Sequence, residues 1–247
     1  MDTISAMAAS GLRARMQELD MLANNLANSG TGGFKLDREF YSLFTASDND
    51  VDGEASPSTM PLIRKQWTDF AQGNLTPTGN PLDVAISGQG FFVASGPGGN
   101  LYTRNGSFQI SPDGTLTTNN GYPVLATDGS QIQLSTQGEV TVGTDGTVSQ
   151  NGQSIAQLQL VDFTDKMALR KMANSYFQAA PKQEPVPATS AEVQQGRVEG
   201  SNVAPAESAV RLVGVMRQFE MLQKAISVTA DMDKKSLDEV ARVAPGA

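Results

Sequence analysis

Apolar residues follow two different patterns along this chain, a helical spacing at both ends and short alternating runs in between. Near the start they recur every three or four positions, at Ile4, Ala8, Leu12, Met16, Leu19, Leu22 and Leu26. Near the end the same spacing joins Ala209, Leu212, Met216, Phe219, Leu222, Ile226 and Thr229. Such spacing puts each set on one face of an α-helix. We therefore expect two amphipathic helices, each needing a partner helix to bury its stripe.

Residues at the ends of these stripes set the expected helix bounds. Asp2 or Thr3 can cap the first helix, and Asn28-Ser29-Gly30 can stop it, which predicts a helix over 3–28. Pro205 suits a first helical position, and the acidic Glu207 suits a first turn. The second helix is expected to run from Pro205 to about Val243.

The centre of the chain has the pattern of short β-strands. Asn-Gly or Asp-Gly pairs, which favour type I′ turns, begin at positions 105, 113, 120, 128, 145 and 151. A short helix capped by Thr164 is expected over Thr164–Met172. The strand-like runs around the turns are Leu82–Ile86, Phe91–Val93, Leu101–Thr103, Ser107–Ile110, Thr115–Thr117, Ile132–Leu134, Val140–Val142 and Ile155–Asp162.

These elements predict an α+β fold with paired, coiled-coil-like terminal helices and a central, mainly antiparallel β-domain. Residues 1–35 and 203–247 would form a terminal helical domain, and 81–180 the β-domain. Residues 36–80 would connect the two, with an exposed loop at 45–61. Because prolines occur at 181, 185 and 187, residues 181–202 are expected to be a linker to the last helix.

Composition narrows the possible functions. The net charge of −8 argues against binding of nucleic acid by bulk electrostatics. No run of about 18 apolar residues occurs, so we expect no direct membrane insertion. The start of the chain lacks a basic segment followed by an apolar one, which predicts no cleaved secretory signal. With no cysteine and no histidine, thiolate nucleophiles, the usual general base and the commonest zinc ligands are missing, so we expect neither an enzyme nor a cofactor.

An acidic loop is the one candidate metal site. Asp48, Asp50 and Asp52 stand at alternate positions before Gly53, as in the first half of an EF-hand calcium loop. Position 12 of that loop would be Thr59 instead of the bidentate glutamate, and Pro57 interrupts the helix that should follow. The pattern favours a solvated acidic loop without a metal. Other acids, such as Asp83, Asp113 and Asp128, fit turns and surface positions.

The terminal stripes have two interpretations. The helices could close the core of one monomer, or they could pack between subunits of an oligomer. Polar residues at 17, 24, 25 and 28 lie on a helix otherwise suited to burial, and interhelical hydrogen bonds would satisfy them. The pattern alone leaves both interpretations open.

Four stretches, in order, resemble a known family. The run Ala23-Asn24-Asn25-Leu26-Ala27-Asn28 followed by Gly33-Phe34-Lys35 is similar to the N-terminal signature of bacterial flagellar rod and hook proteins. The runs at 82–92 and 102–108 resemble the first strands and next hairpin of that family's β-domain. Residues 196–203, Gly-Arg-Val-Glu-Gly-Ser-Asn-Val, resemble the segment before its C-terminal helix. Within the family, the Glu-Gly-Ser-Asn-Val form is most similar to proximal-rod members.

The resemblance implies a structural subunit of the periplasmic flagellar rod. Its partners would be further copies, other rod and hook axial proteins and the flagellar type III export apparatus. The residues expected at the assembly interface are Ile4, Leu12, Met16, Leu19, Leu22, Asn24, Asn25, Leu26, Asn28, Leu212, Met216, Phe219, Leu222 and Ile226. The alternatives are a distal-rod or hook-type subunit, an extracellular calcium-dependent adhesion module and a carboxylate-dependent hydrolase.

Overall fold

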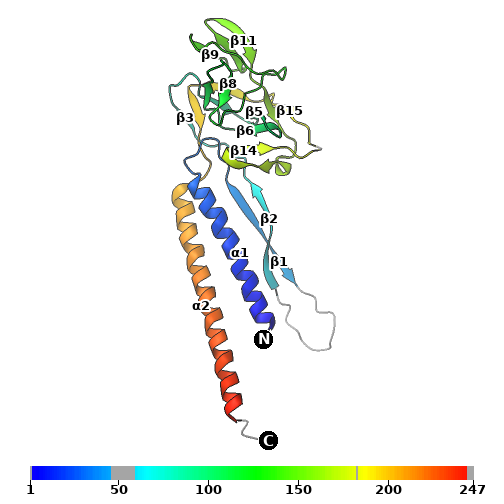
Figure 1. Ribbon diagram of the computed structural model, residues 1–247, viewed down its shortest axis with the longest axis vertical. Helices are drawn as coiled ribbons and strands as arrows, with labels where there is room; N and C mark the ends of the chain where they lie inside the picture. Colours follow the sequence, from blue (N-terminus) through cyan, green and yellow to red (C-terminus); the bar gives the residue numbers. More distant parts are fainter. Residues whose placement is uncertain (1, 46–58, 182, 244–247) are drawn as a thin grey trace. The chain divides into compact units, whose positions relative to one another are not determined.

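The computed structural model describes residues 2–45, 59–181 and 183–243, which form two compact units. One unit consists of residues 1–26, 37–67 and 205–247, and we call it the helical unit. The other, the β unit, consists of residues 27–36 and 68–204. Figure 1 shows the elements of each unit.

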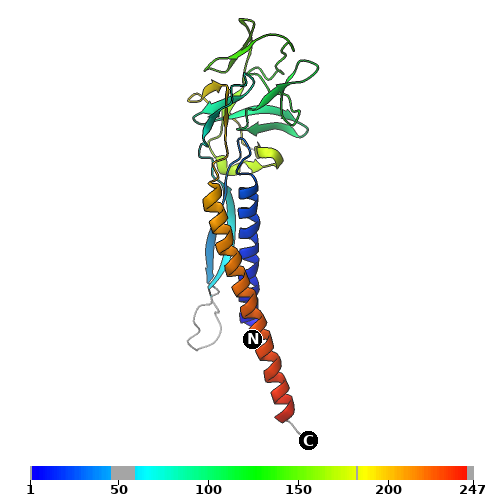
Figure 2. The same cartoon turned by 90° about the vertical axis from the view of Figure 1, so that its left-hand side faces the viewer.

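Two long helices dominate the helical unit. Helix α1 spans Asp2–Ala27 and α2 spans Pro205–Val243, so both predicted helices are confirmed to within one residue at each end. Figures 1 and 2 both show them side by side and antiparallel, with α2 continuing past the N-terminal end of α1. Met21, Leu22 and Val215 are buried where the helices meet, with Leu19 and Leu212 packed around them. An antiparallel helix pair therefore has a small apolar core within one chain.

A pair of strands completes the helical unit and was missed by sequence analysis. Strands β1 (Asp37–Thr45) and β2 (Thr59–Thr68) pair in a two-stranded sheet inside the segment predicted to be a connection. Pro61 is the third residue of β2, and proline is tolerated there because an edge strand leaves one row of N–H groups unpaired. The predicted loop at 45–61 lies mostly outside the described residues.

The β unit consists of short antiparallel strands. Its largest sheet has the order β13 (Arg170–Lys171), β14 (Tyr176–Gln178), β6 (Gly99–Thr103), β5 (Phe91–Gly96), β12 (Leu160–Asp162), β15 (Val186–Pro187). A second has the order β11 (Gln153–Gln157), β10 (Thr147–Gln150), β9 (Val140–Val142). Three two-stranded sheets pair β16 (Glu192–Gln195) with β4 (Val84–Ser87), β17 (Arg197–Glu199) with β3 (Leu75–Pro77), and β7 (Phe108–Ile110) with β8 (Leu116–Thr118). The α+β class and the mainly antiparallel sheets are thus confirmed.

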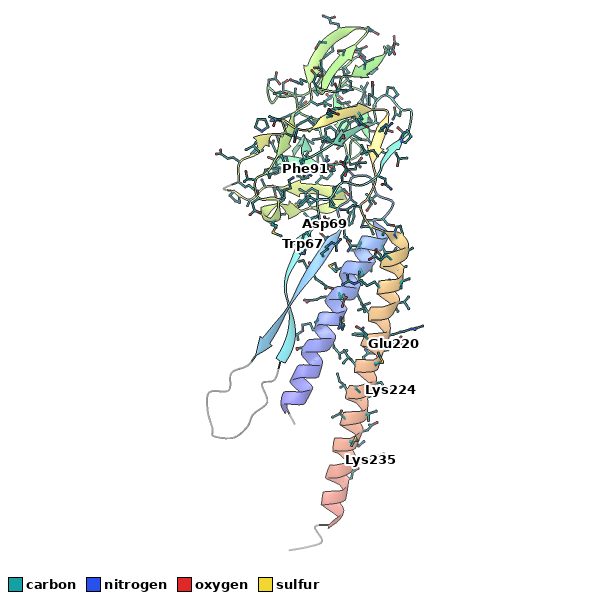
Figure 3. All side chains as sticks on the ribbon, turned by 180° about the vertical axis from the view of Figure 1, so that it is seen from behind. Trp67, Asp69, Phe91, Glu220, Lys224 and Lys235 are labelled. Atoms are coloured by element: carbon teal, nitrogen blue, oxygen red, sulfur yellow. The ribbon has the colours of Figure 1, made fainter. Side chains whose placement is uncertain are left out.

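Two apolar clusters hold the β unit together. One gathers around Phe92, Ile132 and Val148, and the other around Phe91 and Phe177. Phe91, labelled in Figure 3, meets Phe177 with ring centroids 5.8 Å apart. Because successive residues of a strand point to opposite faces, neighbouring Phe91 and Phe92 fill different clusters. Strand β5 therefore lies between the two cores.

Three local predictions were wrong. Residues 181–202 are not an unpaired linker, since β15, β16 and β17 pair with β12, β4 and β3. Between 164 and 172 only a 3₁₀ turn, η1 (Lys166–Ala168), forms, and Asp165 caps it instead of Thr164. A second such turn, η2, spans Ala173–Ser175. The run 132–134 forms no strand: its middle residue Gln133 makes an isolated bridge to Thr115, whereas the preceding Gln131 pairs with a different segment at Leu125.

The predicted turn type holds at one of the six sites. Only Asn151-Gly152 has positive φ at both residues, 53° and 80°, as a type I′ turn requires. At Asp113, Asp128 and Asp145 the following glycine has positive φ but the aspartate does not. There the glycine N–H closes a turn that began three residues earlier, as Gly114 N does to Ser111 O at 2.9 Å. The aspartate instead accepts a hydrogen bond from the Ser or Thr two residues on.

Candidate functional site

The predicted interface residues of α1 do not share one environment. Leu22 is buried, Leu12, Leu19, Leu26 and Asn28 are half-buried, and Met16 and Asn24 are exposed. The side chain of Ile4 lies outside the described residues. Asn25 is fully buried, but its partner is a strand: its Nδ2 donates to Asp37 O at 2.8 Å, and Asp37 N donates to its Oδ1 at 3.0 Å. Asn25 therefore fastens β1 to α1 within the chain.

Helix α2 has apolar residues on two faces. The face toward α1 follows steps of four and three through Ser208, Leu212, Val215, Phe219, Leu222 and Ile226. Val215 is its buried centre, whereas the predicted Met216 is 46% exposed. A second group of apolar residues lies outside that stripe and consists of Val210, Val213, Met216, Met221, Val228 and Met232, all exposed. We call this group the outer face of α2.

A charged cluster joins three elements of the helical unit. The Arg211 guanidinium of α2 lies 3.2 Å from Glu18 Oε1 of α1 and 3.1 Å from Glu39 Oε1 of β1. Arg15 adds a second cation, 2.5 Å from Glu18 Oε2. Both carboxylates are almost fully buried and have little contact with water. The half-exposed Arg211 guanidinium compensates their negative charges. This cluster fixes the register of α1, α2 and β1.

The acids of the described residues do not gather into a metal-binding group. No group of three or more acids that could hold a metal occurs there, and Asp48, Asp50 and Asp52 lie outside them. A groove of about 490 Å³ beside β12 and β15 contains one carboxylate, Asp145. That carboxylate already accepts a hydrogen bond from Thr147 at 2.7 Å. Asp83, expected at the surface, is buried.

Three of the motif stretches meet at a buried ion cluster in the β unit. The Lys35 ammonium lies 2.5 Å from Glu199 Oε1, and the Arg104 guanidinium lies 3.1 Å from Glu199 Oε2. The three side chains are 0%, 2% and 0% exposed, respectively for Lys35, Arg104 and Glu199. Lys35 also donates to Ala71 O, and Arg104 to Gly88 O, both at 2.7 Å. One carboxylate thus holds two cations from segments far apart in the chain.

Burial lowers the pKa of both cations of this cluster. Burial lowers the pKa of the Lys35 ammonium, and the nearby Glu199 carboxylate opposes that shift. Burial likewise lowers the pKa of the Arg104 guanidinium, again opposed by Glu199. Removing the carboxylate would leave two cations in a site without solvent, which is far costlier than losing an exposed ion pair.

Asn202 extends the cluster to the backbone. Its Oδ1 accepts from Leu36 N at 2.8 Å, while its Nδ2 donates to Asp69 O at 2.8 Å and to Ala71 O at 3.1 Å. One side chain therefore binds two segments distant from its own. We call Lys35, Arg104, Glu199 and Asn202 the junction cluster.

Gly33 allows the chain to pass close to this cluster. Its φ is +67°, and a Cβ there would lie 2.3 Å from Asn105 N. Its N–H donates to Glu199 O at 2.7 Å. A side chain at this position would push the Lys35 segment away from the Arg104 hairpin.

Sequence analysis did not identify the junction cluster as a site. Lys35, Arg104 and Glu199 each stood in a stretch noted for resemblance, but nothing in the local pattern shows that distant segments meet. A lysine, an arginine and a glutamate bounded by strand-like or turn residues look like solvated surface charges. The one available signal was that all three belong to stretches that carry the family resemblance.

Comparison with known families agrees with the motif stretches. Residues 6–35 match the model described as flagella basal body rod protein. Residues 85–150 match the D1 domain of the flagellar hook protein FlgE/F/G, and residues 194–239 match the C-terminal part of the flagellar basal body rod FlgEFG protein. Each member of the buried ion pair Lys35–Glu199 therefore lies in a different matched segment.

Proteins that align with about nine tenths of the chain belong to the same group. The chain is 34% identical over 228 residues to the flagellar basal-body rod protein FlgF of Caulobacter vibrioides, covering 92% of this chain and 93% of the relative. It is 34% identical to FlgF of Rhizobium meliloti, covering 89% and 90% of the two chains. It is also 34% identical to the flagellar basal-body rod protein FlgG of Buchnera aphidicola, covering 91% and 95%. The chain belongs to the family of flagellar basal-body rod proteins.

Proposed function

We propose that the chain is a structural subunit of the basal-body rod that polymerises through the outer faces of its terminal helices. The observation that carries this proposal is the outer face of α2. Val210, Met221 and Met232 are 76%, 63% and 63% exposed, although they belong to a helix whose opposite face is already packed. Exposed apolar residues that continue along a helix mark a surface for another protein.

The spacing of the outer face indicates a helical partner. Three outer-face residues, Met221, Val228 and Met232, share a stripe with Gly214, Gln218 and Ala225, along which the steps are four, three, four, three and four. This heptad-like repeat keeps the stripe turned toward one partner helix over about 27 Å, at about 1.5 Å per residue. The small residues Gly214 and Ala225 leave space for side chains from a facing helix. A lipid surface or a small ligand would not require this period.

We further propose that α1 contributes the complementary surface of a neighbouring copy. Ala9, Met16 and Ala23 are exposed on α1, with the half-buried Leu12 and Leu19 between them, again at steps of three and four. Because this surface differs from the outer face of α2, pairing the two between copies does not close after one step. Unlike surfaces that pair in this way generate a ring where the rotation between copies closes and an open helical filament where it does not, and a rod requires the filament.

Leu22 was among the residues expected at the assembly interface, but it is buried beside Val215 of its own chain. A Leu22→Asp variant would therefore break the helix pair of the free subunit. Met221→Asp is the sharper test, because Met221 is 63% exposed and lies outside the buried cluster between the helices.

The experiment compares Met221→Asp with Met167→Asp. Both methionines are exposed, at 63% and 54%, but Met167 lies on η1 of the β unit. We expect both variants to fold, and only Met221→Asp to be absent from isolated basal bodies and to abolish swimming. Normal incorporation of Met221→Asp would refute assembly through the outer face.

As a rod subunit, the protein would reach the periplasm through the flagellar type III apparatus and transmit torque together with other axial proteins. No helix in the described residues is long and apolar enough to cross a membrane. We propose no enzymatic activity and no cofactor, supported by the absence of cysteine and histidine from the sequence.

The position in the rod is proposed to be proximal, as in FlgF. The specific alternative is a distal position, because FlgG relatives share the same 34% identity. Expression in strains lacking FlgF or FlgG separates the two. We expect motility to return in the strain that lacks FlgF, and return only in the strain that lacks FlgG would favour the distal position.

A further inference from the structure

The chain crosses between the helical unit and the β unit four times, after residues 26, 36, 67 and 204. On the β side, each crossing leads into one of three segments, residues 27–36, 68–74 and 199–204. These segments hold the covalent connections between the helical unit and the β unit.

The three segments are hydrogen-bonded to one another. Asp69 N donates to Leu36 O at 2.8 Å, which joins the second segment to the first. Gly200 N donates to Asn74 O at 2.8 Å, which joins the third to the second. Gly33 N donates to Glu199 O at 2.7 Å, which joins the third to the first. The connections therefore form a closed set within the β unit.

Junction-cluster side chains bind the same three segments. Lys35 of the first segment donates to Ala71 O of the second and pairs with Glu199 of the third. Glu199 Oε1 also accepts from Gly73 N at 2.9 Å. Arg104 belongs to none of the segments, and it anchors Glu199 to the backbone at Gly88.

We propose that the junction cluster is a latch that positions the connections to α1, β1, β2 and α2 and passes force between them. This inference rests on the proposed function as a rod subunit. With the latch closed, a pull on one connection is shared among three hydrogen-bonded segments and the Arg104 hairpin. When Glu199 is replaced by a neutral residue, the two buried cations lose their shared anion. The three segments then separate, and a force on one connection is no longer shared with the others.

The first experiment measures amide hydrogen exchange in purified Glu199→Gln. We expect the amides of Gly33, Leu36 and Asp69 to exchange at least about tenfold faster, while Leu125, which donates to Val93 O in the sheet, is unchanged. Asn202→Ala should show the same pattern without disturbing a buried charge, and it carries the test if Glu199→Gln does not fold. Asn120→Ala is the matched control, because Asn120 accepts from Tyr176 away from the junction.

Two results would overturn the latch. One is unchanged exchange at the junction amides. The other is equal acceleration at Leu125, which would mean that Glu199 only stabilises the fold as a whole. Because this measurement uses the free subunit, it stands apart from the test of rod assembly with Met221→Asp.

The second experiment tests force transmission. Val148→Ala, a cavity in the β-unit core, serves as a variant with a similarly lowered Tm. In media of increasing viscosity, we expect cells with Glu199→Gln to lose swimming speed at least about twofold more than cells with Val148→Ala. Equal losses would refute a role beyond stability.

Discussion

At the scale of single residues, two asparagines of the motif stretches form hydrogen bonds to the backbone of their own chain. Asn25 looked like a residue for bonding between helices, yet both of its hydrogen bonds go to Asp37. Asn202 does the same for Leu36, Asp69 and Ala71. An amide side chain carries both a donor and an acceptor, so it can replace a missing backbone partner where segments cross without a continuous sheet.

A buried tyrosine gives a pH prediction at this scale. Burial raises the pKa of Tyr176 above its ordinary 10.0, and its hydroxyl donates to Thr118 Oγ1 at 2.8 Å. Its stabilising contribution is therefore complete below about pH 10 and lost as the pH rises through the folded-state pKa. Burial raises the pKa of Tyr102 as well, so both act in the same direction.

The expected result is a fall in the free energy of unfolding between about pH 8 and about pH 11. Tyr176→Phe should lower the free energy of unfolding by about 1 kcal/mol at the lower pH, because a hydrogen bond is lost. Its free energy of unfolding should also fall less steeply as the pH rises. Urea unfolding at both pH values measures this. A variant as pH-dependent as the original chain would mean that Tyr176 is not responsible.

At the scale of elements, hydrophobic periodicity predicted the helices, which depend on local sequence. It failed for strands that form only by pairing with a distant segment. The helices over 2–27 and 205–243 follow from stripes visible in the sequence. Strand β16 was missed because Glu192-Val193-Gln194-Gln195 has one apolar residue, and its strand state depends on pairing with β4. The junction cluster could not be predicted for the same reason, since Lys35 and Glu199 are adjacent only after folding.

One position on the stripe of α2 provides a prediction at the element scale, because the sequence pattern placed Met216 there and the structure has Val215. Val215 is 5% exposed and Met216 is 46% exposed, although they are neighbours in sequence. Val215→Ala should lower the free energy of unfolding of the free subunit by about 1.5 kcal/mol, from lost apolar burial. Met216→Ala should change it by less than about 0.5 kcal/mol. Chemical denaturation of both variants measures the difference, and the reverse order would place Met216 in the helix pair.

At the scale of the whole molecule, the two units differ in how they bury their apolar residues. The helical unit keeps apolar residues exposed on α2, where charged residues such as Glu220, Lys224 and Lys235 are spaced along the same helix (Figure 3). In the assembly proposed above, these charges would keep the free subunit hydrated, and the apolar stripe would favour association between copies. The β unit has its own two cores and needs no neighbour to bury them.

Assembly should therefore hide α2 and leave much of the β unit accessible. Because the sequence has no cysteine, a single introduced thiol reports on its own site. In the free subunit, Met221→Cys and Met167→Cys should react with a maleimide at similar rates, since both positions are exposed. In intact basal bodies, labelling at 221 should slow at least about tenfold relative to labelling at 167, because burial against a partner helix excludes the reagent. Equal labelling of the two positions in basal bodies would show that the outer face of α2 stays in water after assembly.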